Sequence, residues 1–381
     1  MELRISERAK NYPPSGIRKM FDLATQYPDA IKLTVGEPNF DTPEYIKKAA
    51  KEAIDAGRTH YAPNSGIDEL RQSVANKYKS YWEGYTKDHV IITVGAMEGL
   101  MLSMMAILNP GDEILVPDPC FPNYYGQASI VGAKAVPVPT YEKNEYRIQA
   151  EDIEKAITPH TKAILLNSPC NPTGAVLTRE DVLAIAELVK KHDLWVLSDE
   201  PYDSIVYDGV QPFSIAEVPE VRDQVMVFNS FSKAYAIPGW RLGYSAAVGE
   251  VAASIKSIQS HATSAANCIA QRAGVAALTG PQDSVEAMRR EYERRRDYAF
   301  GALKAMPGVE LEMPHGAFYL FPKVDSYFGT QYQNYQINSS KDLANYLLDE
   351  AEIAVVFGEA FYMNGYLRIS YANSMENIQE A

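Results

Sequence analysis

The chain has 381 residues, more than a single hydrophobic core ordinarily supports, so we expect one large domain and a smaller one. Its 36 Lys and Arg stand against 49 Asp and Glu, and this net charge of −13 argues against a protein that binds nucleic acid or a membrane surface. Three scattered cysteines indicate reduced thiols rather than disulfides or a metal site, and no apolar segment is long enough to span a bilayer. These features favour a cytoplasmic protein that binds small molecules and no metal.

We expect the first 43 residues to form a separate segment that contains one short helix. The helix is expected at residues 15–27, and Val35-Gly36-Glu37-Pro38 has the composition of a turn. We expect this segment to join the carboxyl-terminal part of the chain in the smaller domain.

Residues 44–280 alternate short apolar runs with amphipathic helical stretches, which is the pattern of βαβ units around a mainly parallel sheet. One helix is expected from the capping residue Thr178 to Lys191, with its apolar residues on one face. Seven strands are expected, at residues 90–93, 113–116, 135–138, 163–167, 195–199, 225–230 and 242–247. This pattern predicts an α/β fold with a mostly parallel seven-stranded sheet in a large domain.

Residues 281–381 have a different pattern. A long charged helix is expected from about residue 281 to 306, then a strand at 316–321 and a polar loop at 329–340. The predicted organisation is therefore a large domain of residues 44–280 and a smaller α+β domain built from residues 1–43 and 281–381.

Small or polar residues follow several of the expected strands. In open α/β sheets ligands bind outside the carboxyl ends of the strands, so these residues are the first candidates for a site. Gly95, Ala96 and Met97 open a helix whose free backbone N–H groups suit a phosphate, and Phe121 could stack on a heteroaromatic ring. A tightly packed glycine turn and a core aromatic residue are the alternative interpretations.

Two further strand ends carry polar side chains. Asn171, in Asn-Pro-Thr-Gly, can direct its amide at a ligand oxygen, although an ordinary Asn-Pro turn would have the same sequence. Asp199 could pair with a protonated ring nitrogen and Tyr202 with a ring hydroxyl, whereas a helix cap or a surface carboxylate is the alternative for Asp199.

A further candidate is Lys233, which lies among residues that suit a phosphate. Ser230 and Ser232 offer hydroxyl donors, and Arg241 offers a two-pronged guanidinium. A nearby cation and desolvation would lower the pKa of the lysine and favour the neutral amine that a Schiff base requires. Pyridoxal 5'-phosphate has both an aldehyde and a phosphate, so these residues suggest that this cofactor is held here. The alternative interpretation of the segment is a polar strand end followed by a glycine turn.

In combination, these segments resemble the ordered motifs of class I/II aminotransferases, which are pyridoxal-phosphate enzymes of fold type I. The matching motifs begin at Asn171, Asp199, Ser230 and Gly239, and further matches at residues 35–38 and 366–370 extend the resemblance over nearly the whole chain.

The resemblance implies a role for each candidate residue. Lys233 would form the Schiff base and move the proton between substrate and cofactor. Asp199 would bind the pyridine nitrogen, Tyr202 and Asn171 the ring hydroxyl, and Phe121 the ring face. The phosphate would be held by Gly95, Ala96, Met97, Ser230, Ser232 and Arg241.

The substrate and a second subunit complete the implied site. Arg368 would bind the substrate α-carboxylate, helped by Asn171 and the backbone of Gly36. Tyr61 would reach the phosphate in the neighbouring subunit, which implies a homodimer with shared active sites.

The sequence also departs from the family pattern. Many members have threonine at the position of Ala234 and a small or hydroxyl-bearing residue at the position of Pro238. Neither difference removes a catalytic group. Met97 stands where related aspartate aminotransferases can carry a lysine that binds the distal carboxylate. This weakens the expectation of a strict preference for aspartate, although another cation could take the place of that lysine. The last helix is expected to be short or missing.

Three functions are consistent with these residues. The first is an aminotransferase that moves the amino group of an L-amino acid to a 2-oxo acid by a ping-pong mechanism. The second is a C–S β-lyase or another lyase on the same fold. The third, a cofactor-sensing regulator of DNA binding, lacks a basic module for the DNA. The preferred substrate side chain is left open.

Overall fold

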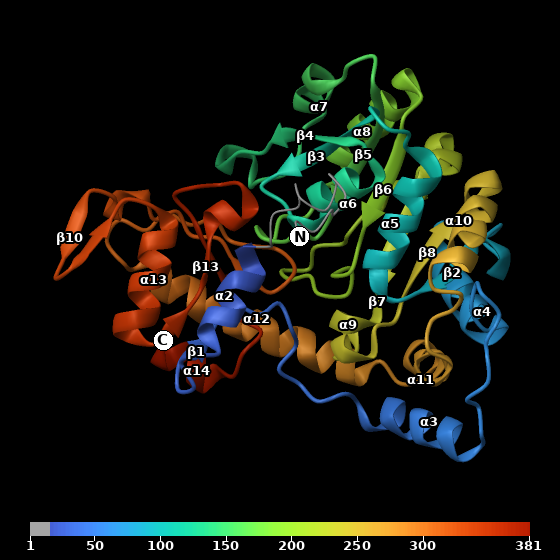
Figure 1. The fold of residues 1–381 in the computed structure, drawn as a ribbon, viewed down its shortest axis with the longest axis horizontal. Coiled ribbons are helices and arrows are strands. Elements are labelled where there is room, and N and C mark those ends of the chain that lie inside the picture. The colour runs from blue at the N-terminus through green and yellow to red at the C-terminus, as the bar shows by residue number, and fades with distance from the viewer. Residues whose placement is uncertain (1–15) are drawn as a thin grey trace, which may run out of the picture.

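The computed structural model describes residues 16–381 and is dominated by a seven-stranded sheet (Figure 1). Its strand order is β2-β8-β7-β6-β5-β3-β4, and only β8 runs antiparallel to its neighbours. The strands are β2 (Val90–Thr93), β3 (Glu113–Asp118), β4 (Lys134–Pro139), β5 (Thr161–Asn167), β6 (Trp195–Asp199), β7 (Val225–Ser230) and β8 (Gly243–Ala247). All seven predicted strands and the α/β fold are confirmed, with shifts of a few residues at some ends.

Helices cover both faces of this sheet because its strands carry apolar residues on both sides. One face packs against α3 (Glu44–Asp55), α4 (Asp68–Lys77), α7 (Ala150–Ala156), α8 (Arg179–His192) and α11 (Cys268–Thr279). The other packs against α5 (Gly95–Ile107), α6 (Asn123–Val131) and α10 (Gly249–Ala262). Thr178 caps α8 as predicted, since its hydroxyl accepts the Asp181 N–H while the Asp181 carboxylate accepts the Thr178 N–H.

The two ends of the described chain meet beside this sheet, where blue and red elements lie together in Figure 1. Strand β1 (Ile31–Lys32) pairs in parallel with β12 (Ile353–Ala354). A three-stranded antiparallel sheet has the order β13-β14-β9. The elements of this region are α2 (Gly16–Ala24), α12 (Asp283–Lys304), β9 (Tyr319–Leu320), α13 (Ser340–Ala351), β13 (Val356–Phe357), β14 (Leu367–Ser370) and α14 (Met375–Glu380).

The structure differs from the sequence-based expectations in three places in this region. The polar loop expected at 329–340 contains a hairpin of β10 (Thr330–Tyr332) and β11 (Tyr335–Ile337), whose tyrosine rings pack on Tyr346. The strand expected at 316–321 is only the two residues of β9. The helix expected at 15–27 ends at Ala24, and Ser15 lies outside the described residues.

Candidate active site

The predicted site residues meet in one cavity of about 260 Å³ at the carboxyl ends of β2, β3, β5, β6 and β7. Every predicted residue except Gly95 and Tyr61 lines it. The large sheet supplies one wall, while Gly36, Tyr319 and Arg368 come from the region where the chain ends meet. We call this space the inner cavity.

Lys233 lies on α9 (Phe231–Ala234), a single helical turn directly after β7. The Ser230 side chain caps this turn by accepting the Ser232 N–H, and the Lys233 amine donates to the Gly36 carbonyl at 2.5 Å. The helical turn thus points the lysine away from its own strand and across to the other wall of the inner cavity.

The Lys233 amine has a lowered pKa. Desolvation is the main cause and brings its pKa to about 8, against the opposing charge of Glu37. The cations Arg241 and Arg368 lower the pKa further, whereas Asp199 raises it. A substantial fraction of the amine is therefore neutral and nucleophilic near neutral pH.

Asp199, the last residue of β6, is only 5 % exposed. Its Oδ2 accepts the Tyr124 hydroxyl at 2.7 Å, while its Oδ1 has no hydrogen-bond partner among the described residues. Burial raises the pKa of this carboxyl to about 7, and the Tyr124 hydrogen bond and Lys233 oppose the shift. One buried carboxylate oxygen is therefore available to a cationic or N–H group in the cavity.

Ser230, Ser232 and Arg241 form a cradle with the first turn of α5. The Ser230 and Ser232 hydroxyls lie 2.7 Å apart, and both residues are buried. Gly95 has a φ of +72°, and a Cβ there would lie 2.6 Å from Nη2 of Arg241. Glycine at this position lets the guanidinium approach the backbone at the amino end of the helix, an arrangement that suits a phosphate.

Arg368 lies in the middle of β14, is 2 % exposed and lines the inner cavity. It donates to the Thr34 carbonyl at 2.6 Å and to Oδ1 of Asn171 at 3.0 Å. Its guanidinium lies 4.5 Å from the centre of the Tyr319 ring, and its Nε has no partner among the described residues. A buried guanidinium with a free N–H suits a carboxylate ligand.

The chain was compared with known proteins. The family model for aminotransferase class I and II matches residues 28–381. Aromatic-amino-acid aminotransferase 2 of Thermococcus litoralis is 42 % identical over 100 % of this chain and 96 % of its own length. Aspartate aminotransferase of Pyrococcus abyssi is 40 % identical over the same shares. The structure of the Rhizobium meliloti aspartate aminotransferase matches with a TM-score of 0.95 at 36 % identity, covering 100 % of this chain and 97 % of that chain.

The chain belongs to the class I and II aminotransferases. It is accordingly a pyridoxal-phosphate-dependent transaminase of fold type I. The aminotransferase hypothesis of the three is therefore supported, and the family resemblance predicted from the sequence is confirmed.

The residues of this aminotransferase fit its cofactor. The unpartnered Oδ1 of Asp199 suits the ring nitrogen, and the cradle at Gly95 would be closed by any side chain. The Tyr202 and Tyr319 hydroxyls are hydrogen-bonded at 2.8 Å, and both residues line the inner cavity. Phe121 lines the same cavity, as a ring-stacking residue must.

Sequence reasoning missed three polar residues that line the inner cavity, Tyr124, Asn167 and Tyr319. Asn167 ends β5 and links two strand ends, because its amide donates to the Asp199 carbonyl and its Oδ1 accepts the Asn171 N–H. Its position as the last polar residue of a buried strand was a usable signal. Tyr124 and Tyr319 had none, because only the fold brings them to Asp199 and Tyr202.

Two predicted residues do not line the inner cavity: Gly95, which lies against Arg241 of its lining, and Tyr61. The Tyr61 position is the one that a single chain leaves without a role. The Tyr61 side chain is fully exposed, at 101 %.

No helix among residues 16–381 is long and apolar enough to cross a membrane.

Proposed function

We propose that the inner cavity transfers an amino group from an L-amino acid to a 2-oxo acid, with Lys233 as the catalytic residue. The observation that supports this most is that a neutralisable amine, a buried carboxylate oxygen without a partner and a buried guanidinium line one cavity. They match the aldehyde carbon, the ring nitrogen and the substrate carboxylate, respectively. The bound cofactor supplies an aldehyde and a protonated ring that withdraws electrons from the substrate Cα.

The protein groups then divide the work. Nζ of Lys233 would move the proton between the substrate Cα and the carbon of the cofactor aldehyde, and its lowered pKa favours this role because the amine must be neutral to accept a proton. Asp199 keeps the ring nitrogen protonated, and the positive charge there holds the Asp199 carboxyl ionised. Arg368 orients the substrate by its α-carboxylate, with Asn171 beside it.

The remaining cofactor contacts follow the same division. In this proposal the ring is bound by Tyr202, Asn171 and Phe121. The phosphate is bound by Ser230, Ser232, Arg241 and the backbone of residues 95–97, at the amino end of α5. The Gly36 carbonyl accepts a hydrogen bond from the Lys233 amine, and in this proposal it lies beside the bound substrate.

The assembly is also part of the proposal. A homodimer in which Tyr61 reaches the partner's phosphate would explain a fully exposed tyrosine in a single chain.

The domain organisation and the location of the protein belong to the proposal too. The pairing of β1 with β12 supports a smaller domain made of residues 1–43 and 281–381 beside a large domain of residues 44–280. Three free cysteines support a cytoplasmic location.

Half-reaction measurements test the function. An amino acid added alone should release about one equivalent of 2-oxo acid per subunit, and initial rates against both substrates should give parallel double-reciprocal lines. Release of pyruvate and thiol from cystathionine without an acceptor, and no transfer to any 2-oxo acid, would replace transamination by lyase chemistry.

The role of Lys233 is tested by borohydride reduction followed by peptide mapping. The wild-type protein should carry the reduced cofactor on the peptide that contains Lys233, and Lys233→Ala should carry none and have no turnover. Lys256→Ala is the matched control, because Lys256 does not line the inner cavity and its amine donates to the Asp88 carbonyl, so this variant should keep both properties.

A further inference from the structure

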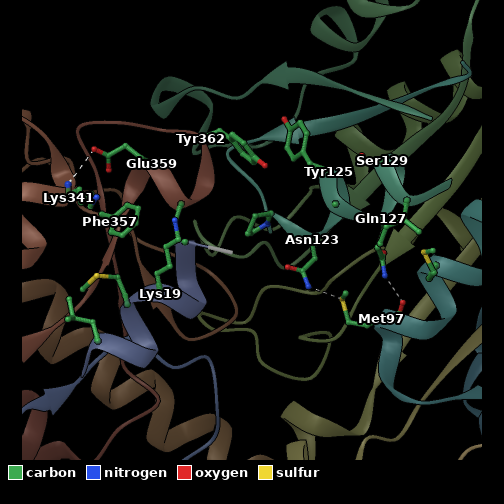
Figure 2. Close-up of a pocket in the computed structure, with 18 of the residues that line it drawn as sticks. Lys19, Met97, Asn123, Tyr125, Gln127, Ser129, Lys341, Phe357, Glu359 and Tyr362 are labelled. Atoms are coloured by element: carbon green, nitrogen blue, oxygen red, sulfur yellow. Dashed lines mark hydrogen bonds between the residues drawn. The ribbon is translucent and has the colours of Figure 1, made fainter. Parts of the chain in front are cut away.

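A second and larger cavity adjoins the inner one. It has a volume of about 930 Å³ and lies between α5 and α6 on one side and α2, α13 and residues 357–362 on the other (Figure 2). Met97, in the first turn of α5, lines both cavities. We call this second space the outer cavity, and Met97 stands where the two meet.

The described residues of one chain leave the inner cavity without a spare cation for a second carboxylate. Among the described residues that line it, the cations are Lys233, Arg241 and Arg368, and each has a task in the proposed reaction. The other walls near Met97 are the apolar Ile17 and Leu100. A short side chain that ends in a carboxylate, such as that of aspartate, would therefore lose its water without gaining a cation.

The outer cavity suits a large uncharged group. Met101, Tyr125 and Phe357 contribute thioether and aromatic surface, and the rings of Tyr125 and Tyr362 lie in contact, with centres 4.3 Å apart and planes inclined by 50°. Aromatic rings and thioethers pack well against such surface. Three charged residues also line this cavity. Lys19 and Lys341 are exposed to solvent and lie across it from Met97 in Figure 2, and Glu359 lies beside Lys341, whose backbone N–H donates to the Glu359 carboxylate.

Met97 is held in place by the two amides beside it. The Gln127 amide donates to the Met97 carbonyl at 2.7 Å, and Nδ2 of Asn123 lies 3.8 Å from the Met97 sulfur, as the dashed lines in Figure 2 mark. Gln127 is 6 % exposed, and its Oε1 has no partner among the described residues. A polar acceptor is thus available to a hydroxyl or N–H on an otherwise uncharged ligand.

We propose that the substrate side chain passes Met97 into the outer cavity, so that amino acids with large uncharged side chains, aromatic or thioether, are preferred over aspartate. Met97 is the specificity-determining residue in this arrangement. The inference rests on the proposed function, because it assumes that the substrate α-carboxylate is bound by Arg368.

The test compares substrates and unreactive analogues in the holoenzyme. For the wild type, kcat/KM for phenylalanine, tyrosine or methionine should exceed that for aspartate by at least about 10-fold, and 3-phenylpropionate should bind more tightly than maleate. Met97→Lys should lower the ratio of phenylalanine to aspartate by at least about 10-fold, because it places a cation where the distal carboxylate ends.

Met105→Lys is the matched control. It makes the same change on the same helix, but Met105 is 47 % exposed and lines neither cavity, so the ratio should stay at the wild-type value. A wild type that prefers aspartate, or a Met97→Lys variant that behaves like Met105→Lys, would overturn the inference while transamination stands. If no amino acid reacts at all, the proposed function fails, and the two analogue dissociation constants alone decide the inference.

Discussion

At the scale of single residues, burial sets the protonation of the site. The pKa of the Asp199 carboxyl rises to about 7 and that of the Lys233 amine falls to about 8, since desolvation disfavours the charged form of each. Two groups that ordinarily titrate far apart are thereby brought close to neutral pH. The lowered pKa of Lys233 suits its proposed proton transfer better than that of an exposed lysine would.

This shift predicts how the protein captures the cofactor. The apoprotein should react with pyridoxal, which lacks the phosphate, at a rate that rises as pH increases through about 8, because only the neutral Lys233 amine is nucleophilic. Arg241→Gln removes a cation that lowers the Lys233 pKa, so its rate profile should move to higher pH. Absorbance of the adduct measures both, and a profile that moves to lower pH would contradict the assignment.

At the scale of elements, the start of α5 and the start of α10 offer a comparison within one sheet. Both helices begin with a glycine at positive φ, +72° at Gly95 and +65° at Gly249. A Cβ at Gly95 would meet Arg241, whereas a Cβ at Gly249 would meet nothing within 4 Å. The same backbone strain is therefore present at both positions, but only one of them adjoins the phosphate cradle.

Alanine substitutions separate the two effects. Gly95→Ala and Gly249→Ala should each lower the free energy of unfolding by about 1–2 kcal/mol, the cost of a left-handed backbone for a residue with a Cβ. Only Gly95→Ala should also weaken pyridoxal-phosphate binding, by about 10- to 100-fold if one charge-assisted hydrogen bond from Arg241 is lost. Denaturant unfolding and equilibrium dialysis measure these quantities. Equal cofactor affinity in both variants would contradict the cradle.

At the scale of the whole molecule, the proposed site is incomplete in one chain if Tyr61 serves the partner's phosphate. Subunits carrying Tyr61→Ala should then complement subunits carrying Lys233→Ala, because a mixed dimer has one site with both residues intact. Reassociation of equal amounts should restore about a quarter of the wild-type activity, since half of the dimers are mixed and each has one intact site. Activity equal to the average of the two unmixed samples would show that Tyr61 acts within its own chain or not at all.

Much of this architecture could be predicted from local patterns. The strands that end in Asp199 and Ser230 were placed to the residue, because buried parallel strands are continuous apolar runs between turn residues. The hairpin at 330–337 was missed, because alternating Tyr, Gln and Asn carries little apolar periodicity. The two-residue strand β9 was predicted too long, since an apolar run does not show where pairing with a neighbour stops.

The sequence by itself determined the sheet and the family and predicted the residues proposed to carry the chemistry, because most of the motifs follow a strand closely and need no distant contact to be recognised. Only the tertiary structure decided which side chains surround them. Tyr124 reaches Asp199 from 75 positions away, and Arg368 meets Asn171 from 197 positions away. Such contacts depend on how strands are ordered and chain ends are packed, and no local pattern encodes that order. The same holds for Met97, whose place between two cavities appears only when α2 and α5 face one another.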